Sequence, residues 1–205
     1  MSRAQIKTDN SYFEEKVRLR IDNLPAADPL IVLDMYAGTG RIWEEVRRRT
    51  GRNIKTLGIE KRKIDGRIYL RGDNEKFNLD FNRFHVIDVD AYGIPFLQLK
   101  NVFRKTRVPM TIFITFIRTC YGRLPDALLE SLGFSRRMYR KIRAIFYYNG
   151  DQKFLCFLGN MGVRNIKLYR TSDGDKNYGC IKINENSTLQ FKDKTSRIIT
   201  RQKSK

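Results

Sequence analysis

The chain has 205 residues, with 41 Lys and Arg against 22 Asp and Glu, which gives a formal net charge of +19. This length suits one large domain with its own core, and 41% hydrophobic residues exclude a chain that is disordered by composition. Three cysteines without close spacing and a single histidine disfavour a disulfide framework and a structural zinc site. The charge favours a polyanionic partner, because Lys and Arg release counterions from phosphates.

Membranes are the competing polyanionic surface, and the sequence disfavours them. The longest apolar stretch, residues 108–117, is far shorter than the roughly 18 residues that a membrane span requires. The first part of the chain mixes acidic and basic residues without an apolar centre, so it does not look like a secretory signal. We therefore expect a cytoplasmic protein with no membrane partner and no metal, whose clustered basic residues bind nucleic acid.

Apolar runs and helical patterns alternate along the chain. Residues 30–33 predict a strand that is buried on both faces, a helix follows the loop at residues 35–40, and residues 54–60 predict a second, parallel strand. The later predictions are strands at 67–71, 84–89, 108–117, 165–171 and 178–184, and helices at 96–105, 124–132, 135–148 and 152–158. A turn at residues 172–175 makes the last two strands an antiparallel hairpin.

This alternation predicts an α/β protein with a Rossmann-like fold, in which a mostly parallel central sheet ends in a C-terminal antiparallel hairpin. We expect residues 27–185 to form the domain, with a basic helical insertion at 118–149. Residues 1–26 are predicted to be an N-terminal extension and residues 186–205 a basic C-terminal tail. Both chain ends are expected to be mobile in isolation, because they offer little to a core.

The first predicted strand ends at an acid and a glycine-rich loop, where such folds bind ligands. Gly38 and Gly40 let the backbone turn sharply and approach a ligand, and the helix that follows offers free N–H groups. Glu60, twenty residues beyond Gly40, ends the second strand and is placed to accept hydrogen bonds from ribose hydroxyls. The loop alone fits an ordinary turn, and Glu60 alone fits a solvated carboxylate. Their combination favours a cofactor that contains adenosine.

Two common phosphate-binding motifs are absent from this loop. Trp43 stands where the dinucleotide fingerprint has its third glycine, and Gly40 is not followed by the Lys-Ser/Thr ending of a P-loop. Asp34, four residues before the first glycine, suits a cationic, zwitterionic ligand better than a pyrophosphate.

The segment Asp34-x-Tyr36-Ala37-Gly38-x-Gly40 resembles the first motif of the class I S-adenosylmethionine-dependent methyltransferases, and Glu60 matches their second-strand acid. The resemblance implies that S-adenosylmethionine is the cofactor. It also implies that this loop holds the methionine part and that Glu60 holds the ribose. The adenine ring would then lie against Asp73 or Asn74.

A second acidic pair ends the strand predicted at residues 84–89. Asp88 and Asp90 are two residues apart, so their side chains share a face of the sheet. A carboxylate there can accept a hydrogen bond from an exocyclic amine, orient its nitrogen for methyl transfer and take its proton. Tyr92 offers a planar face on which a base can stack, although a core tyrosine is an equally simple interpretation. These three residues are the predicted catalytic group.

Residues 85–95 resemble the fourth motif of amino-methyltransferases, and in particular the Asp-x-Asp-Pro-Tyr/Phe-Gly-Ser-Pro segment of the tRNA guanine-N2 dimethyltransferases. The segment departs from that pattern at Ala91 and Ile94. The resemblance implies N-methylation of a base amine in a tRNA-like RNA, with RNA favoured over DNA.

A basic helix is expected to guide the nucleic acid toward Tyr92. The residues are Arg136, Arg137, Arg140 and Lys141. A merely solvated helix face is the alternative. Two other functions stay open, namely a non-catalytic nucleic-acid-binding module on a methyltransferase fold, and a C5-pyrimidine RNA methyltransferase whose nucleophile is Cys120.

Overall fold

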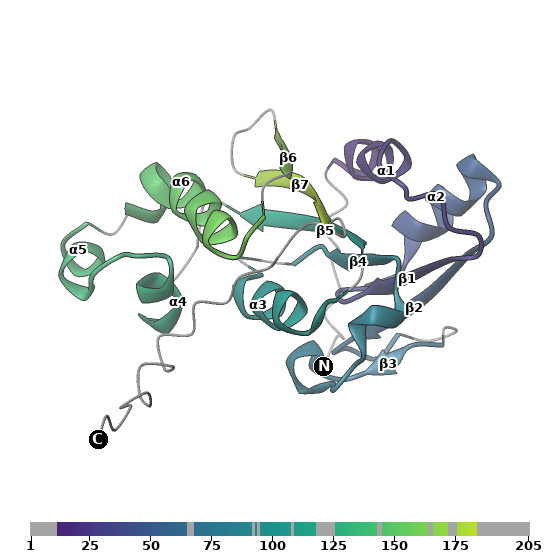
Figure 1. Cartoon of the computed structure of the whole chain (residues 1–205), viewed down its shortest axis with the longest axis horizontal. Helices are drawn as coiled ribbons and strands as arrows, with labels where there is room; N and C mark the ends of the chain where they lie inside the picture. The colour runs from purple at the N-terminus through teal and green to yellow at the C-terminus, as the bar shows by residue number, and fades with distance from the viewer. Residues whose placement is uncertain are drawn as a thin grey trace, which may run out of the picture.

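A computed structural model describes residues 12–64, 68–91, 93, 95–107, 109–117, 126–142, 145–163, 166–171 and 176–183. Seven strands in this part of the chain form one sheet, in the order β3-β2-β1-β4-β5-β7-β6 (Figure 1). They are β1 (Leu30–Asp34), β2 (Ile54–Glu60), β3 (Leu70–Arg71), β4 (Val86–Val89), β5 (Met110–Ile117), β6 (Ile166–Arg170) and β7 (Lys176–Ile183). Strands β1 to β5 are paired in parallel, and β7 is antiparallel to both β5 and β6. The predicted α/β fold is confirmed.

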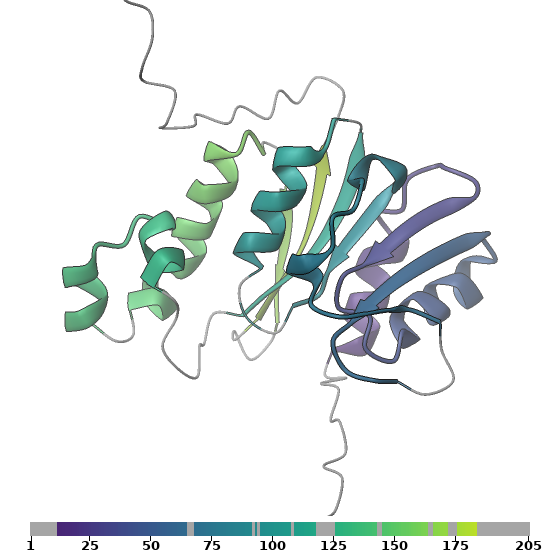
Figure 2. The same ribbon diagram turned by 90° about the horizontal axis from the view of Figure 1, so that it is seen from below.

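Helices cover both faces of the sheet (Figure 2). On one face lie α1 (Phe13–Ile21) and α2 (Arg41–Thr50), whose buried Val17, Trp43 and Val46 pack against apolar residues of β1 and β4. On the other face lies α3 (Phe96–Lys105), which buries Leu99 and Val102. Between β5 and β6 the chain forms α4 (Asp126–Ser131), α5 (Arg136–Lys141) and α6 (Ile145–Asn160), and two short 3-10 turns, Asn74–Lys76 and Phe81–Arg83, precede β4.

The helical region after β5 differs from the prediction. The helix expected at 135–148 ends as α5 at Lys141, and α6 then runs without a break through the Gly150 position where the sequence pattern predicted a gap. Ring stacking explains this continuity, because Phe154 lies on Phe116 of β5 at a centroid distance of 4.4 Å and Phe157 contacts Phe96 of α3 at 4.6 Å. Packing of this kind outweighs the cost of one glycine in a helix, which is about 1 kcal/mol.

The helix α1 is the second difference. It falls in the region predicted to be an N-terminal extension, yet Val17 is completely buried and α1 packs against α2 and β7. The spacing of Phe13, Val17 and Ile21 at every fourth residue is the signal that could have indicated a helix with a core-facing side. Residues 1–11 and 184–205, which include the predicted tail, lie outside the described residues.

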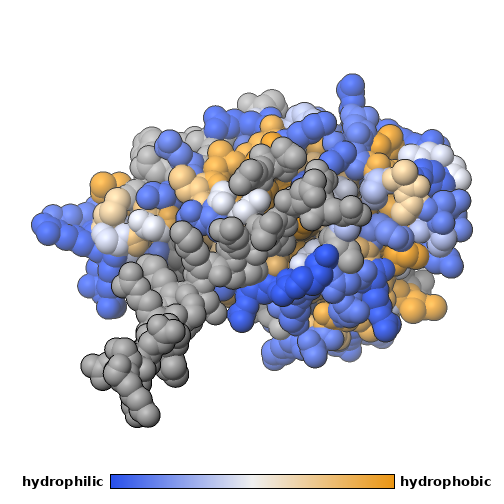
Figure 3. All heavy atoms as spheres, viewed as in Figure 1, coloured by the Kyte–Doolittle hydropathy of each residue, from blue (hydrophilic) through white to orange (hydrophobic). Residues whose placement is uncertain are grey.

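One face of the molecule is seen in Figure 3. Figure 3 shows blue, hydrophilic residues over much of the visible face, including the end of the molecule where α5 lies. Among the described residues, no helix is long and apolar enough to cross a membrane.

Candidate functional site

The glycine-rich loop joins β1 to α2 and is held tightly against β2. Gly38 and Gly40 have φ angles of 46° and 68°, in the left-handed region where residues with a side chain are strained. Ala37 donates its N–H to the carbonyl of Ile59 at 3.0 Å. A Cβ atom on Gly58 would lie only 2.8 Å from the Cβ of Ala37, so a glycine in β2 is also required for this close approach. The predicted sharp turn is confirmed, and its tight fit to β2 emerges only in the fold.

Glu60 ends β2 beside this loop. Its Oε2 accepts a hydrogen bond from the N–H of Gly38 at 3.0 Å, and its Oε1 accepts one from the N–H of Arg62 at 3.0 Å. A carboxylate has about four acceptor positions, so two remain for hydroxyl groups of a ligand. The structure thus brings together the loop and the acid that the sequence placed twenty residues apart.

The two candidates for contact with adenine have different surroundings. Asn74 is buried, and its amide donates to the carbonyl of Met35 at 2.9 Å and accepts from Gln98 at 3.3 Å. Asp73 is one-third exposed and lies 3.5 Å from the ammonium of Lys61. Asn74 therefore holds the start of the glycine-rich loop through the carbonyl of Met35. Asp73 is the more accessible of the two candidates.

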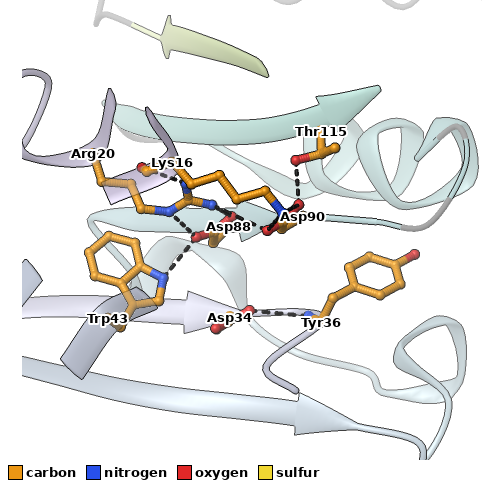
Figure 4. A network of polar contacts seen from close by, with 8 residues as sticks. All are labelled: Lys16, Arg20, Asp34, Tyr36, Trp43, Asp88, Asp90 and Thr115. Atoms are coloured by element: carbon orange, nitrogen blue, oxygen red, sulfur yellow. Dashed lines mark hydrogen bonds and ion pairs between the residues drawn. The ribbon is translucent and has the colours of Figure 1, made fainter. Parts of the chain in front are cut away.

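Asp34 lies at the centre of the sheet edge, because the strand register places it beside Gly58 of β2 and Asp88 of β4. Its carboxyl is buried and accepts a hydrogen bond from the N–H of Tyr36 at 3.2 Å (Figure 4). Burial, followed by repulsion from Asp88, holds the pKa of Asp34 well above its ordinary value, although Arg20 acts in the opposite direction.

Asp88 is enclosed by side chains from two helices. Arg20 of α1 donates from Nε to Oδ2 at 2.7 Å and from Nη2 to Oδ1 at 2.8 Å, and Trp43 of α2 donates from Nε1 to Oδ2 at 2.8 Å (Figure 4). The Asp88 and Arg20 side chains are each only 2% exposed. Burial raises the pKa of Asp88, and the attraction of Arg20 does not outweigh it. Both carboxylate oxygens of Asp88 are therefore occupied by protein donors, which leaves little room for a substrate atom.

Asp90, just beyond β4, is bound by Lys16 and Thr115. The Lys16 ammonium donates to Oδ1 at 3.1 Å and to Oδ2 at 2.8 Å, and the Thr115 hydroxyl also donates to Oδ1 (Figure 4). Burial alone would raise the pKa of Asp90, but attraction to Lys16 and Arg20 is stronger and lowers it. Asp90 keeps 13% of its side chain exposed. It is therefore the more accessible acid of the predicted pair.

Four residues that hold these acids were not predicted as part of the site: Lys16, Arg20, Trp43 and Thr115. Lys16 and Arg20 are four residues apart on a helix, which indicates a shared face but does not identify the carboxylates they meet. Tyr92 and Cys120 lie outside the described residues.

The predicted nucleic-acid-binding residues lie apart from this edge. Arg136, Arg137, Arg140 and Lys141 are exposed on α5. Figure 1 shows α5 at one end of the molecule, with α2 and β2 toward the other.

No family model matches this chain, and no curated protein matches it in sequence. Solved structures, however, share its fold. A possible exported protein from Bordetella parapertussis matches with a TM-score of 0.60 at 9% identity, over 85% of this chain and 67% of that one. TYW2 of M. jannaschii, solved in complex with AdoMet, matches with a TM-score of 0.53 at 13% identity, over 87% of this chain and 78% of that one. The CurJ carbon methyltransferase matches with a TM-score of 0.52 at 12% identity, over 82% of this chain and 54% of that one.

At these identities the likeness establishes the fold alone. The chain thus has the Rossmann-like fold of TYW2, which binds AdoMet in its solved structure, and of the CurJ carbon methyltransferase, as its first motif predicted.

Proposed function

We propose that this protein is an S-adenosylmethionine-dependent methyltransferase that acts on nucleic acid, and that its acceptor is an exocyclic amine of a base in RNA. The observation that carries the first part is the meeting of the glycine loop, Glu60 and Asp34 at one sheet edge, in a fold shared with the CurJ carbon methyltransferase and with TYW2 in complex with AdoMet.

The residues at this edge fit the cofactor. The left-handed Gly38 and Gly40 leave the loop without side chains where a ligand would approach, and Glu60 retains acceptor positions for ribose hydroxyls. The buried Asp34 supplies negative charge that a cationic ligand would neutralise. When bound, the cofactor supplies a methyl group on a positively charged sulfur.

Asp90 is the residue we assign to the acceptor. Its lowered pKa keeps it ionised through neutral pH, so it can accept a hydrogen bond from an amine and orient the nitrogen lone pair. Asp88 is assigned a positioning role instead, because Arg20 bridges the two acids, at 2.7 Å from Asp88 and 3.9 Å from Asp90. Tyr92, two residues beyond Asp90, is expected to stack against the base.

Nucleic acid as the polymer is supported by charge. The net charge of +19 and the exposed basic residues of α5 suit a phosphate backbone. The likeness of residues 85–95 to the tRNA guanine-N2 dimethyltransferases favours an amine in RNA.

Transfer of a labelled methyl group to total tRNA, rRNA and DNA in parallel, followed by nucleoside analysis, tests the proposal. We expect label in an N-methylated nucleoside of RNA. Glu60→Ala should weaken cofactor binding, whereas Asp90→Asn should bind the cofactor and lose turnover by about a hundredfold or more. Asp22→Asn, at a surface acid paired with Arg18, is the matched control and should behave as the wild type. Nucleic-acid binding without cofactor binding would instead indicate a non-catalytic module.

A further inference from the structure

The charges at the sheet edge do not balance within the protein. Three carboxyl groups meet at the adjacent ends of β1 and β4, on Asp34, Asp88 and Asp90, and α1 contributes two cations, Lys16 and Arg20. The Lys16 ammonium donates to Asp90, and the Arg20 guanidinium donates to Asp88 and to the carbonyl of Lys16. With all five groups ionised, this cluster would carry a net charge of minus one.

Asp34 is the one of these three acids that no cation pairs with in the described residues. It is 6% exposed, accepts a hydrogen bond from the N–H of Tyr36, and forms no ion pair with any residue in the described ranges. Burial and the neighbouring acids therefore favour its protonated form in the unliganded protein.

Other charged groups approach Asp34 from α2 and β2. A recess that is open to solvent adjoins Asp34 and is lined also by Glu44 and Arg47. Those two side chains carry opposite charges and are exposed, so water screens them. Glu60 is turned toward Gly38. None of these groups supplies the buried positive charge that Asp34 lacks.

S-adenosylmethionine and its demethylated product differ by one charge. The ammonium and carboxylate of the amino-acid part cancel in both, so the sulfonium leaves S-adenosylmethionine with a net charge of plus one, and S-adenosylhomocysteine is neutral. A buried site favours overall neutrality, because an uncompensated charge is poorly solvated there. The charged cofactor matches an ionised Asp34, and the neutral product matches a protonated one.

We propose that Asp34 discriminates between the two by exchanging a proton: it is ionised when S-adenosylmethionine is bound and protonated when S-adenosylhomocysteine is bound. This inference rests on the proposed function. In the transfer, the acceptor lone pair forms the new bond to the methyl carbon, the electron pair of the C–S bond stays on sulfur, and the acceptor loses one proton. Asp34 then takes up one proton from solvent as the sulfonium charge disappears.

Titration calorimetry of the full chain tests this directly. Each ligand is titrated in buffers with different ionisation enthalpies, from about pH 5.5 to about pH 7, below the range in which the α-amino group of either ligand titrates, to count the protons exchanged. At the acidic end, S-adenosylmethionine should release close to one proton and S-adenosylhomocysteine close to none. The ratio of the two dissociation constants should shift toward S-adenosylmethionine as the pH rises, by up to about tenfold per pH unit.

The variant Asp34→Asn should abolish the pH dependence of this ratio, and Asp22→Asn should retain it. A thermal melt shows whether each variant is folded. If Asp34→Asn does not fold, the numbers of protons exchanged by the wild type still test the proposal. Binding of both ligands with the same proton count would overturn the role of Asp34 and leave the proposed function intact. Binding of neither ligand by the wild type would overturn the proposed function itself.

Discussion

The role assigned to Asp88 differs between the sequence and the structure. As one of two acids near a strand end it predicts catalysis, but both of its oxygens are occupied by Arg20 and Trp43. A buried charge pair of this kind contributes little net stability compared with apolar packing. Removal of one partner is nevertheless destabilising, because it leaves an uncompensated charge in the core.

Truncation of Arg20 tests this at the residue level. Arg20→Ala should lower the free energy of unfolding by about 3–5 kcal/mol, because Asp88 loses its buried partner. The double variant Arg20→Met with Asp88→Asn should recover part of that loss, since it removes both charges. Urea unfolding measures both values. A loss below about 1 kcal/mol for Arg20→Ala would contradict the buried pair.

Cys180 is a core residue, as its sequence pattern predicted. The sequence pattern placed it in a core, and burial raises its pKa to about 11 in β7. A thiol that holds its proton in this way is a poor nucleophile at neutral pH.

At the level of elements, α1 packs against the sheet and supplies the cation of each of two buried ion pairs, Lys16–Asp90 and Arg20–Asp88. Its Lys16 and Arg20, one helical turn apart, face the two acids at the end of β4. Sequence patterns predicted β2 and α3 with the bounds that the structure shows, because an apolar run or an apolar helix face is a local property. Sequence patterns did not identify Lys16 and Arg20 of α1 as buried residues, because only the carboxylates they meet far along the chain make them so.

Replacement of Lys16 tests the role of α1 through pH. In the wild type the lowered pKa of Asp90 contributes stability that is present above the pKa of the unfolded chain and is lost as the pH falls through the folded value. In Lys16→Met, burial prevails and the pKa of Asp90 should rise, so its contribution should instead fall as the pH rises. We expect the stability difference between the two proteins to grow from pH 3 toward neutrality, by about 1 kcal/mol or more in chemical unfolding. A difference that does not vary with pH would contradict this pairing.

At the scale of the whole molecule, the basic helix α5 lies apart from β1, β2 and α2, which carry the glycine loop and Glu60 (Figure 1). An acceptor that contacts both must extend across the surface between them, as a folded RNA can and a free nucleoside cannot. The net charge of +19 would then act in binding and orientation.

The triple variant Arg136→Gln, Arg137→Gln and Arg140→Gln tests this arrangement. It should weaken RNA binding and reduce the slope of log affinity against log salt by up to about 0.9 for each phosphate contact removed. Its matched control is Arg18→Gln, Lys55→Gln and Arg83→Gln, three exposed cations elsewhere on the surface. Filter binding at several salt concentrations compares the two. Equal slopes would show that α5 has no special part in binding.

The sequence by itself determined the α/β alternation, the glycine turn and the acids Asp34, Glu60, Asp88 and Asp90, because periodicity and motif spacing are written locally along the chain. Only the tertiary structure decided how those acids are partnered. Parallel strand register places Asp34 beside Asp88, and α1, which packs from outside the predicted domain, neutralises Asp88 and Asp90 but not Asp34. Such pairings join residues up to 74 positions apart in the sequence. Because Asp34 is buried without a cationic partner, a cationic ligand would stabilise its ionised form.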